Sequence, residues 1–434
     1  MLLDFSVANY RCFAEEAALD LTRNGLKTLT PRPGTSWADS TRHVAAIYGA
    51  NAAGKSTLLD ALDCLRRAVG GRRDILHQPY SLDQEHPSAP TQYRIGFVHD
   101  DIRYEYSVES HSWGIAREEL WAVGARWKKL FVRTQASEDR EPTIEAGSSL
   151  KGATTEVRRI TTADDLFLAV ALRYRHETLE PIARSLREIR TIHHNDYERT
   201  ARLQWMMERL ADKPARWSEP SDAIAHAADL GITRVDLEER DVPPEVLGEV
   251  RRLLKSEDGA DADIPEEILR SLQRSLVFLH TGPDGEGHRL ILGAQSQGTL
   301  TWFATVGPAI DALRCGGLLL VDELDASLHP TLTTALVELF KDPDLNRTGA
   351  QLVFTTHDTS LLNNSPTQVL EAGEVWLCEK NSGGACELFS LADFTSTRRG
   401  TNKQRRYLIG AFGAIPRVDM SHIRRILAAG TEED

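Results

Sequence analysis

The stretch from Ile47 to Leu62, IYGANAAGKSTLLDAL, contains residues whose types and spacing suit the binding of a phosphate group. It satisfies the pattern G-x-x-x-x-G-K-[ST], in which glycines let backbone N–H groups wrap around phosphate oxygens. The lysine reaches the β- and γ-phosphates, and the serine offers its hydroxyl to Mg²⁺. We therefore predict that ATP and Mg²⁺ bind here, with the nucleotide ligands Gly49, Asn51, Gly54, Lys55, Ser56 and Thr57 and with Ser56 as a ligand of the metal.

The segments on either side of this pattern are those that a phosphate loop requires. HVAAIY, residues 43–48, is a short apolar run suited to a buried strand. TLLDALDCLRRA, residues 57–68, has apolar residues at helical spacing and no helix breaker. The start of that helix adds a partial positive charge next to the loop. An ordinary glycine-rich turn is the alternative, and it would not account for this context.

A second apolar run, GGLLLVDELDASLHP at residues 316–330, ends in two carboxylates. Consecutive aliphatic residues predict a buried parallel strand that delivers Asp322 and Glu323 to its C-terminal edge, where nucleotide sites of open α/β sheets lie. We expect Asp322 to hold Mg²⁺ and Glu323 to act as the general base that activates water. The alternative is an acidic strand end that simply leads into a turn.

A third apolar run, AQLVFTTHD at residues 350–358, predicts another buried strand with His357 at its end. A histidine in this position can hydrogen-bond the γ-phosphate and so respond to its presence. A lone histidine at a strand end is also often a structural residue. We favour the phosphate role because the run follows the carboxylate strand.

The long stretch between the phosphate loop and the carboxylates resembles the ABC-type ATPases, in which a lever domain separates two ATPase lobes. In AAA+ unfoldases the two motifs lie close in sequence. The ABC class also has a signature Ser-x-Gly at a helix start, which Ser296 and Gly298 match, followed by a predicted helix from Thr299. This resemblance implies that the signature acts on the nucleotide of a second copy in a head-to-tail dimer. A plain Ser/Thr capping turn is the alternative.

The signature S-x-G-T, the elements LDASLHP and TTHD, and the C-terminal RRYLIGAFGAIP together resemble AAA family ATPases of bacterial anti-phage systems. These include ATPases partnered with RloB-type or other TOPRIM-like nucleases, the PARIS and Septu ATPases, and the ATPase half of OLD-family nucleases. The resemblance implies that Asp325 lies in a D-loop at the dimer interface and that Arg11 of NYRCF approaches the nucleotide. Tyr10, Cys12 and Gln295 depart from the family pattern, and Gln78 is a candidate for the Q-loop, which is otherwise not evident.

The order of predicted elements indicates an α/β fold of the P-loop NTPase, ABC-ATPase type, in which two sequence-separated lobes form one nucleotide-binding domain. Residues 1–158 are strand-rich and contain the phosphate loop, residues 159–274 form a helical insert, and residues 275–434 form the second lobe. The acidic segment KSEDGADADIPEE, residues 255–267, is predicted to be an exposed loop. Proline and glycine interrupt the insert, which therefore lacks the sustained heptads of a long coiled coil.

Composition limits the remaining possibilities. Hydrophobic residues make up 41% of the 434 residues, and no apolar run approaches the roughly 18 residues that span a bilayer, so we expect a cytoplasmic protein without a membrane partner. Five scattered cysteines without C-x-x-C spacing indicate buried thiols rather than disulfides or zinc ligands. The net charge of −13 disfavours nucleic-acid binding by the whole surface and leaves room for a local basic segment.

These observations lead to the hypothesis of an ATP-driven dimeric switch that senses infection and controls a separately encoded effector, such as a TOPRIM-like nuclease. Only 77 residues follow His357, too few for a TOPRIM domain in this sequence. Residues 396–426 carry eight Lys or Arg and one Asp, and we expect this basic segment to dock a protein partner, with nucleic acid as second choice. An SMC-like DNA-repair ATPase and a transporter ATPase are the alternatives. The compact insert and the net charge speak against the first, and the presence of a large insert speaks against the second.

Overall fold

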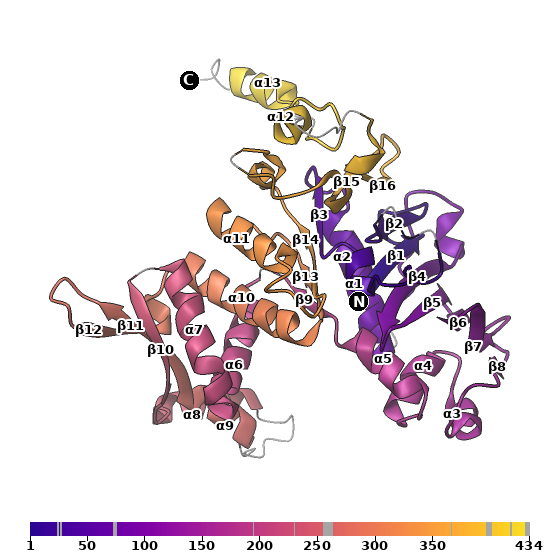
Figure 1. Ribbon diagram of the computed structural model, residues 1–434, viewed down its shortest axis with the longest axis horizontal. Coiled ribbons are helices and arrows are strands. Elements are labelled where there is room, and N and C mark those ends of the chain that lie inside the picture. Colours follow the sequence, from indigo (N-terminus) through magenta and orange to yellow (C-terminus); the bar gives the residue numbers. More distant parts are fainter. Residues whose placement is uncertain are drawn as a thin grey trace. The chain divides into compact units, whose positions relative to one another are not determined.

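The computed structural model describes two compact units, one built from Met1–Ile189 with Val353–Asp434 and the other from Arg190–Leu352 (Figure 1). The described residues are 1–23, 26, 28–72, 76–193, 195–229, 231–254, 264–365, 367–395, 402–416 and 419–429. The predicted division of the sequence into three parts remains a prediction. The two units are defined by contacts between residues, whereas the predicted parts are defined by their helix and strand patterns. Most of the acidic segment 255–267 lies outside the described residues.

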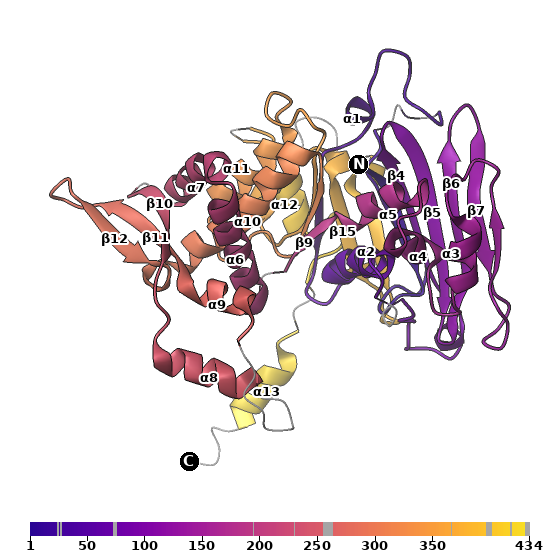
Figure 2. The ribbon, with the colours of Figure 1, turned by 90° about the horizontal axis from the view of Figure 1, so that it is seen from below.

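An antiparallel sheet of seven strands in the order β2-β1-β4-β5-β6-β7-β8 dominates the first unit (Figure 2). Side chains of β5 alternate between buried and partly exposed, which is the period-2 pattern of a strand with one covered face. The strands are β1 (Leu2–Ala8), β2 (Ala17–Asp20), β4 (Thr91–His99), β5 (Ile102–His111), β6 (Gly114–Val123), β7 (Trp127–Thr134) and β8 (Thr143–Ala146). This confirms the predicted strand-rich N-terminal region.

Helices of the first unit pack against this sheet and against one another. The ring of Phe167, at the start of α4, meets the ring of Phe131 from β7 edge-on, with 4.9 Å between centroids. Glu118 of β6 accepts hydrogen bonds from the backbone N–H groups of Phe167 and Leu168, so the sheet caps the start of α4. The helices are α1 (Trp37–Ser40), α2 (Lys55–Val69), α3 (Thr154–Ile160), α4 (Phe167–Arg173) and α5 (Leu179–Arg187), with the 3-10 turn η1 (His86–Ser88).

A second set of strands in the first unit follows the order β16-β15-β3-β14. β15 pairs parallel with β3 and antiparallel with β16. The unit boundary falls within β14, and the C-terminal helices follow these strands. The elements are β3 (Val44–Gly49), β14 (Gln351–Thr355), β15 (Val375–Lys380), β16 (Cys386–Ser390), η3 (Thr359–Leu362), η4 (Ala372–Glu374), η5 (Leu391–Asp393), α12 (Lys403–Leu408) and α13 (Ser421–Ala429).

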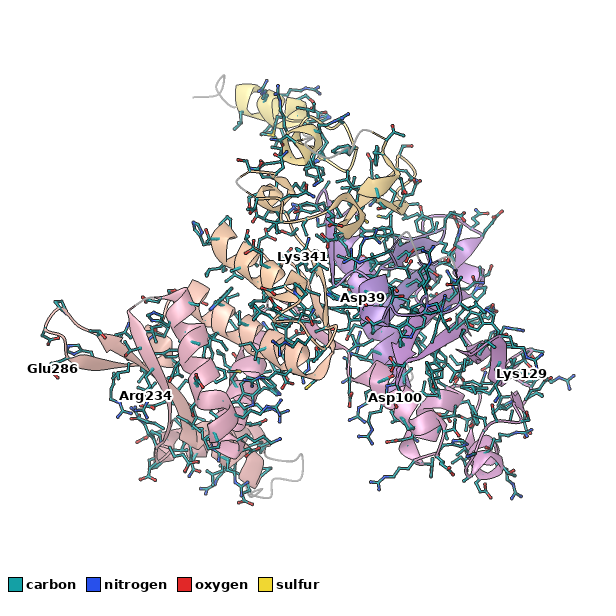
Figure 3. All side chains as sticks on the ribbon, in the orientation of Figure 1. Asp39, Asp100, Lys129, Arg234, Glu286 and Lys341 are labelled. Atoms are coloured by element: carbon teal, nitrogen blue, oxygen red, sulfur yellow. The ribbon has the colours of Figure 1, made fainter. Side chains whose placement is uncertain are left out.

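The second unit contains strands in the order β14-β13-β9 and a separate antiparallel sheet β10-β11-β12. Figure 1 shows the latter beside α7, and Glu286, labelled in Figure 3, lies in the connection between β11 and β12. The elements are β9 (Arg190–Ile192), α6 (Asp196–Asp212), α7 (Pro214–Ala228), β10 (Ile232–Glu239), α8 (Pro244–Leu254), α9 (Glu266–Gln273), β11 (Arg274–Thr281), β12 (Gly287–Ile291), η2 (Leu292–Ala294), α10 (Gln297–Cys315), β13 (Leu318–Val321) and α11 (Pro330–Lys341).

Helix α10 is the centre of the second unit. A Cβ atom on Gly307 would lie 2.3 Å from the sulfur of Met206, so the glycine lets α10 pack closely on α6. The indole N–H of Trp302 donates to the carbonyl of Ile224 at the end of α7. With 19 residues, α10 is the longest helix of the described part of the chain. None of the described helices is both long and apolar enough to cross a membrane.

Candidate functional site

The predicted phosphate loop joins β3, which ends at Gly49, to α2, which begins at Lys55. Both glycines have positive φ angles, 155° at Gly49 and 99° at Gly54, which other residues rarely adopt. A Cβ atom on Gly49 would lie 2.3 Å from the carbonyl oxygen of Cys378, so any side chain would push the loop off β15. The strand, loop and helix therefore occur where the sequence predicts them, and packing explains why glycine is needed.

Lys55 is buried at the start of α2, and its ammonium lies at the loop. Its Nζ donates to the carbonyls of Gly49 and Ala50 at 2.9 and 3.0 Å. A helix leaves its first N–H groups without acceptors inside the helix, and Gly54 has no side chain that could cap them. A fixed ammonium and a helix start of this kind suit an anion, so the loop fits the triphosphate of a nucleotide.

His357 follows β14. The residues on either side of it form hydrogen bonds with β3, the strand that precedes the phosphate loop. The N–H of Thr356 donates to the carbonyl of Ile47 at 3.1 Å. The hydroxyl of Tyr48 donates to the carbonyl of Asp358 at 2.9 Å. Within the first unit, the exposed His357 is therefore flanked by residues that contact the last residues before Gly49. The chain brings these segments together although about 300 residues separate them.

Arg11 lies against α2. Its guanidinium donates to Asp60 at 2.8 Å and to the side-chain oxygen of Gln78 at 2.7 Å. Its backbone has a φ of 48°, and its N–H donates to the carbonyl of Gln78. The family-derived candidates Arg11 and Gln78 thus contact each other in the unit that carries the phosphate loop.

The carboxylates Asp322 and Glu323 follow β13 in the second unit. The N–H of Asp322 donates to the carbonyl of Ile192, which fixes the strand end against β9. Glu323 is exposed and has a φ of 54°, an uncommon conformation for a residue other than glycine. A turn follows, in which the N–H of Ala326 donates to the carbonyl of Glu323 and that of Leu328 to the carbonyl of Asp325. Backbone strain of this kind often occurs at functional sites.

The predicted signature forms the start of α10 in the same unit. Ser296 is the residue before the helix, and its Oγ accepts a hydrogen bond from the N–H of Thr299 at 3.1 Å. The geometry of a capping turn, the alternative interpretation, is therefore present. A Cβ atom on Gly298 would lie 3.1 Å from the carbonyl oxygen of Ser327 in the turn after Glu323. The signature and the predicted D-loop consequently pack against each other.

The predicted site residues fall into two groups. The first unit holds Arg11, Gly49, Asn51, Gly54, Lys55, Ser56, Thr57 and His357, and the second holds Ser296, Gly298, Asp322, Glu323 and Asp325. The roles of these residues toward ATP and Mg²⁺ stay predictions. The cysteines are scattered in the sequence, yet Cys12, Cys378 and Cys386 all lie at the phosphate loop. No local signal could reveal this, because most of the chain separates Cys12 from the other two.

Comparison with known proteins gives a family. Residues 44–363, more than half of the chain, match the family described as "AAA domain, putative AbiEii toxin, Type IV TA system". No curated protein matches the sequence. The match and the strand–loop–helix unit confirm the predicted α/β fold of a P-loop ATPase domain.

Solved structures that resemble the chain include SMC head domains. They are the SmcHead bound to the C-winged helix domain of ScpA (13% identity, 90% of this chain, 97% of that chain, TM-score 0.46) and the SMC head domain from Thermotoga maritima (11%, 90%, 98%, 0.40). A third is the Smc head domain with an extended coiled coil bound to the C-terminal domain of ScpA derived from Pyrococcus furiosus (12%, 90%, 96%, 0.41). The assignment rests on the family match. This chain belongs to the family described as "AAA domain, putative AbiEii toxin, Type IV TA system".

Proposed function

We propose that the protein is an ATP-hydrolysing switch that dimerises head to tail in the cytoplasm and controls a separately encoded effector, a TOPRIM-like nuclease, in defence against phage. The observation that carries the ATPase part is the phosphate loop, with Lys55 held at two loop carbonyls and with Gly54, which has no side chain, directly before α2. The family description, which names a toxin of a toxin–antitoxin system, supports action together with a partner protein.

Each predicted site residue has a role in this proposal. The loop N–H groups and Lys55 bind the phosphates, and Ser56 and Asp322 would hold Mg²⁺, which when bound offsets phosphate charge. Glu323 takes the proton of the attacking water, and His357 responds to the γ-phosphate. Ser296 and Gly298 act on the nucleotide of a second copy, with Asp325 at the interface between copies. Arg11 orients the first turns of α2 through its ion pair with Asp60.

The C-terminal segment offers a route from the phosphate loop to a partner. The ring of Tyr407 in α12 meets the ring of Tyr48 edge-on at 5.7 Å, directly before Gly49. Gln404 donates to the hydroxyl oxygen of Thr359, two residues after His357. Leu408 and Ile409, at the end of α12, are 59% and 71% exposed. A change at the loop or at His357 can therefore reach an exposed apolar surface through two contacts.

Not all basic residues of the segment 396–426 are available to a partner, although the sequence alone would predict that they are. Lys403 is buried, and its ammonium donates to the carbonyl of Leu370, so this charge serves the fold. The guanidinium of Arg406 stacks on Phe412 at 5.4 Å. Arg398, Arg399 and Arg417 lie outside the described residues. Arg405 is exposed beside Leu408 and Ile409 and is therefore the residue with which to test docking.

Capture of the product of the adjacent reading frame tests the partner proposal. The two proteins are co-expressed, and the tagged ATPase is purified with ATP. We expect wild type to retain the effector and Arg405→Glu to retain at least about tenfold less, as for a charged interface hot spot, with unchanged ATP hydrolysis. Arg140→Glu, an exposed arginine of the first unit, is the matched control and should behave as wild type.

Equal capture by Arg405→Glu and wild type would remove this surface from the proposal. Absence of any capture by wild type would remove the adjacent product as the partner. A DNA-clamping role is not favoured, because the longest described helix has 19 residues and the described part of the chain therefore contains no long coiled coil.

A further inference from the structure

Three of the five cysteines surround the phosphate loop. The thiol of Cys378 donates to the carbonyl of Ala53 at 2.8 Å. A Cβ atom on Gly54 would lie 2.8 Å from the sulfur of Cys12 and 3.2 Å from the sulfur of Cys386. Both sulfurs thus contact the glycine that precedes α2. The predicted phosphate ligands do not use these thiols.

Cys12 and Cys386 are close enough to form a disulfide. A Cβ atom on Gly54 would touch both sulfurs, so they face the same small space beside this glycine. The N–H of Cys386 donates to the carbonyl of Cys12 at 2.7 Å. A direct backbone hydrogen bond of this kind brings two Cα atoms into the range that disulfides span, about 4.4–6.8 Å. Cys386 is also near enough to Cys12 to lower the pKa of its thiol.

We propose that a peroxide converts Cys12 and Cys386 into a reversible disulfide that weakens nucleotide binding at the phosphate loop. The sulfur of Cys12 attacks a peroxide oxygen, the O–O bond breaks, and a sulfenic acid and one water form. The sulfur of Cys386 then attacks that of Cys12, the S–S bond forms, and the oxygen leaves as a second water. Two thiols and hydrogen peroxide thus give one disulfide and two waters, and a thiol reductant reverses the step.

Cys12 is the thiol suited to react first. It is partly exposed, whereas Cys386 is 3% exposed. Hydrogen bonds from Cys386 and Thr57, together with the charge of Lys380, lower the pKa of Cys12 to about 7. Burial raises the pKa of Cys64 to about 11 and that of Cys378 to about 12, which keeps these thiols protonated and unreactive.

The disulfide would act on the loop through two contacts. The side chain of Thr57, in the first turn of α2, favours the thiolate of Cys12, and a disulfide sulfur carries no charge for it to stabilise. Formation of the bond also draws the sulfurs to about 2.05 Å from each other, which moves at least one of them along Gly54. Gly54 has a φ of 99° and directly precedes Lys55. A sulfur that moves along Gly54 therefore shifts the backbone next to the residues that would contact phosphate.

Peptide mapping and calorimetry test the inference, which rests on the proposed ATP binding. Purified protein is treated with hydrogen peroxide or with dithiothreitol, and ATP binding in the presence of Mg²⁺ is measured by titration calorimetry. We expect a peptide that links Cys12 to Cys386, an affinity at least about tenfold lower after peroxide, and recovery on reduction. Cys12→Ser and Cys386→Ala should keep their affinity after peroxide. Cys315→Ser, which removes an exposed cysteine of the other unit, should respond as wild type does.

The outcomes separate the inference from the proposed function. Absence of the linked peptide, or a linked protein that binds ATP as tightly as the reduced protein, overturns the switch. A reduced protein that does not bind ATP overturns the proposed function and, with it, the effect on the nucleotide, while the linked peptide would still establish the cysteine pair.

Discussion

Two helix N-termini carry the predicted phosphate contacts, and the chain builds them differently. Helix α2 begins after Gly54, which has no side chain to accept a hydrogen bond from the first turn. Helix α10 begins after Ser296, whose Oγ accepts from the N–H of Thr299 and lies 2.9 Å from its Oγ1. Each end belongs to a different unit of the structure.

The difference indicates which end depends on an external anion. The start of α2 has a fixed ammonium and a glycine, which has no side chain, at the position before the helix, and this suits the binding of phosphates. The start of α10 satisfies part of its own hydrogen-bonding capacity, so a phosphate there must compete with Ser296. We therefore propose that nucleotide binding depends more on the start of α2 than on the start of α10.

Glu323→Gln is expected to give the largest effect on turnover. The amide fits the same turn but cannot accept the proton of the attacking water, so ATP hydrolysis should fall by about 10²- to 10⁴-fold while ATP affinity is retained. A steady-state phosphate-release assay measures this, and light scattering should show an ATP-dependent dimer that accumulates. Glu286→Gln, an exposed glutamate of the same unit (Figure 3), is the matched control. Unchanged turnover in Glu323→Gln would exclude Glu323 as the base.

Ser296→Arg tests the role of the start of α10 in hydrolysis. Bulk and charge at the start of α10 should reduce hydrolysis by about 100-fold, in the range of a lost transition-state contact, and leave ATP binding at α2 intact. If the signature acts on the nucleotide of a second copy, a mixture with Lys55→Ala protein contains some dimers with one intact site, and activity should partly return. A mixture that never exceeds the sum of its components would contradict the shared site.

Ser296→Ala has a smaller expected effect, on stability. Loss of the cap should lower the free energy of unfolding by about 1 kcal/mol, because the N–H of Thr299 loses its acceptor. Denaturant unfolding followed by circular dichroism measures the change. Ser218→Ala, within α7 of the same unit, replaces an exposed helical serine and should not destabilise the protein. Equal stability of Ser296→Ala and wild type would show that Ser296 does not cap α10.

The sequence predicts the elements that carry the motifs but misses parts of the second unit. Periodicity and glycine spacing correctly place β3, α2, β13, β14 and the start of α10, because each element follows from local residue types. Helix α7 lies in the predicted helical insert although it contains Pro220, which ordinarily ends a helix, and burial of Trp217 and Ile224 offsets that preference. Strand β10 is missed beside it, because its side chains lack clear alternation.

Local sequence patterns could not predict contacts between residues that are far apart in the sequence. The hydrogen bond that holds the residue before His357 against Ile47 of β3 depends on the order of strands in the sheet, which residue spacing in the sequence does not reveal. The three cysteines at the phosphate loop are residues 12, 378 and 386, and nothing in their immediate sequence neighbours distinguishes them from Cys64 and Cys315. The buried position of Lys403 likewise follows from its bond to Leu370.

The central claim is that the loop at the start of α2 binds the phosphates of ATP, and titration calorimetry of Lys55→Ala with ATP and Mg²⁺ tests it most directly. Loss of an ammonium that bonds phosphate oxygens is worth about 3 kcal/mol, so affinity should fall at least about 100-fold. Lys129→Ala, a surface lysine paired with Glu145 (Figure 3), should bind ATP as wild type does. ATP affinity of Lys55→Ala equal to that of wild type would contradict the claim.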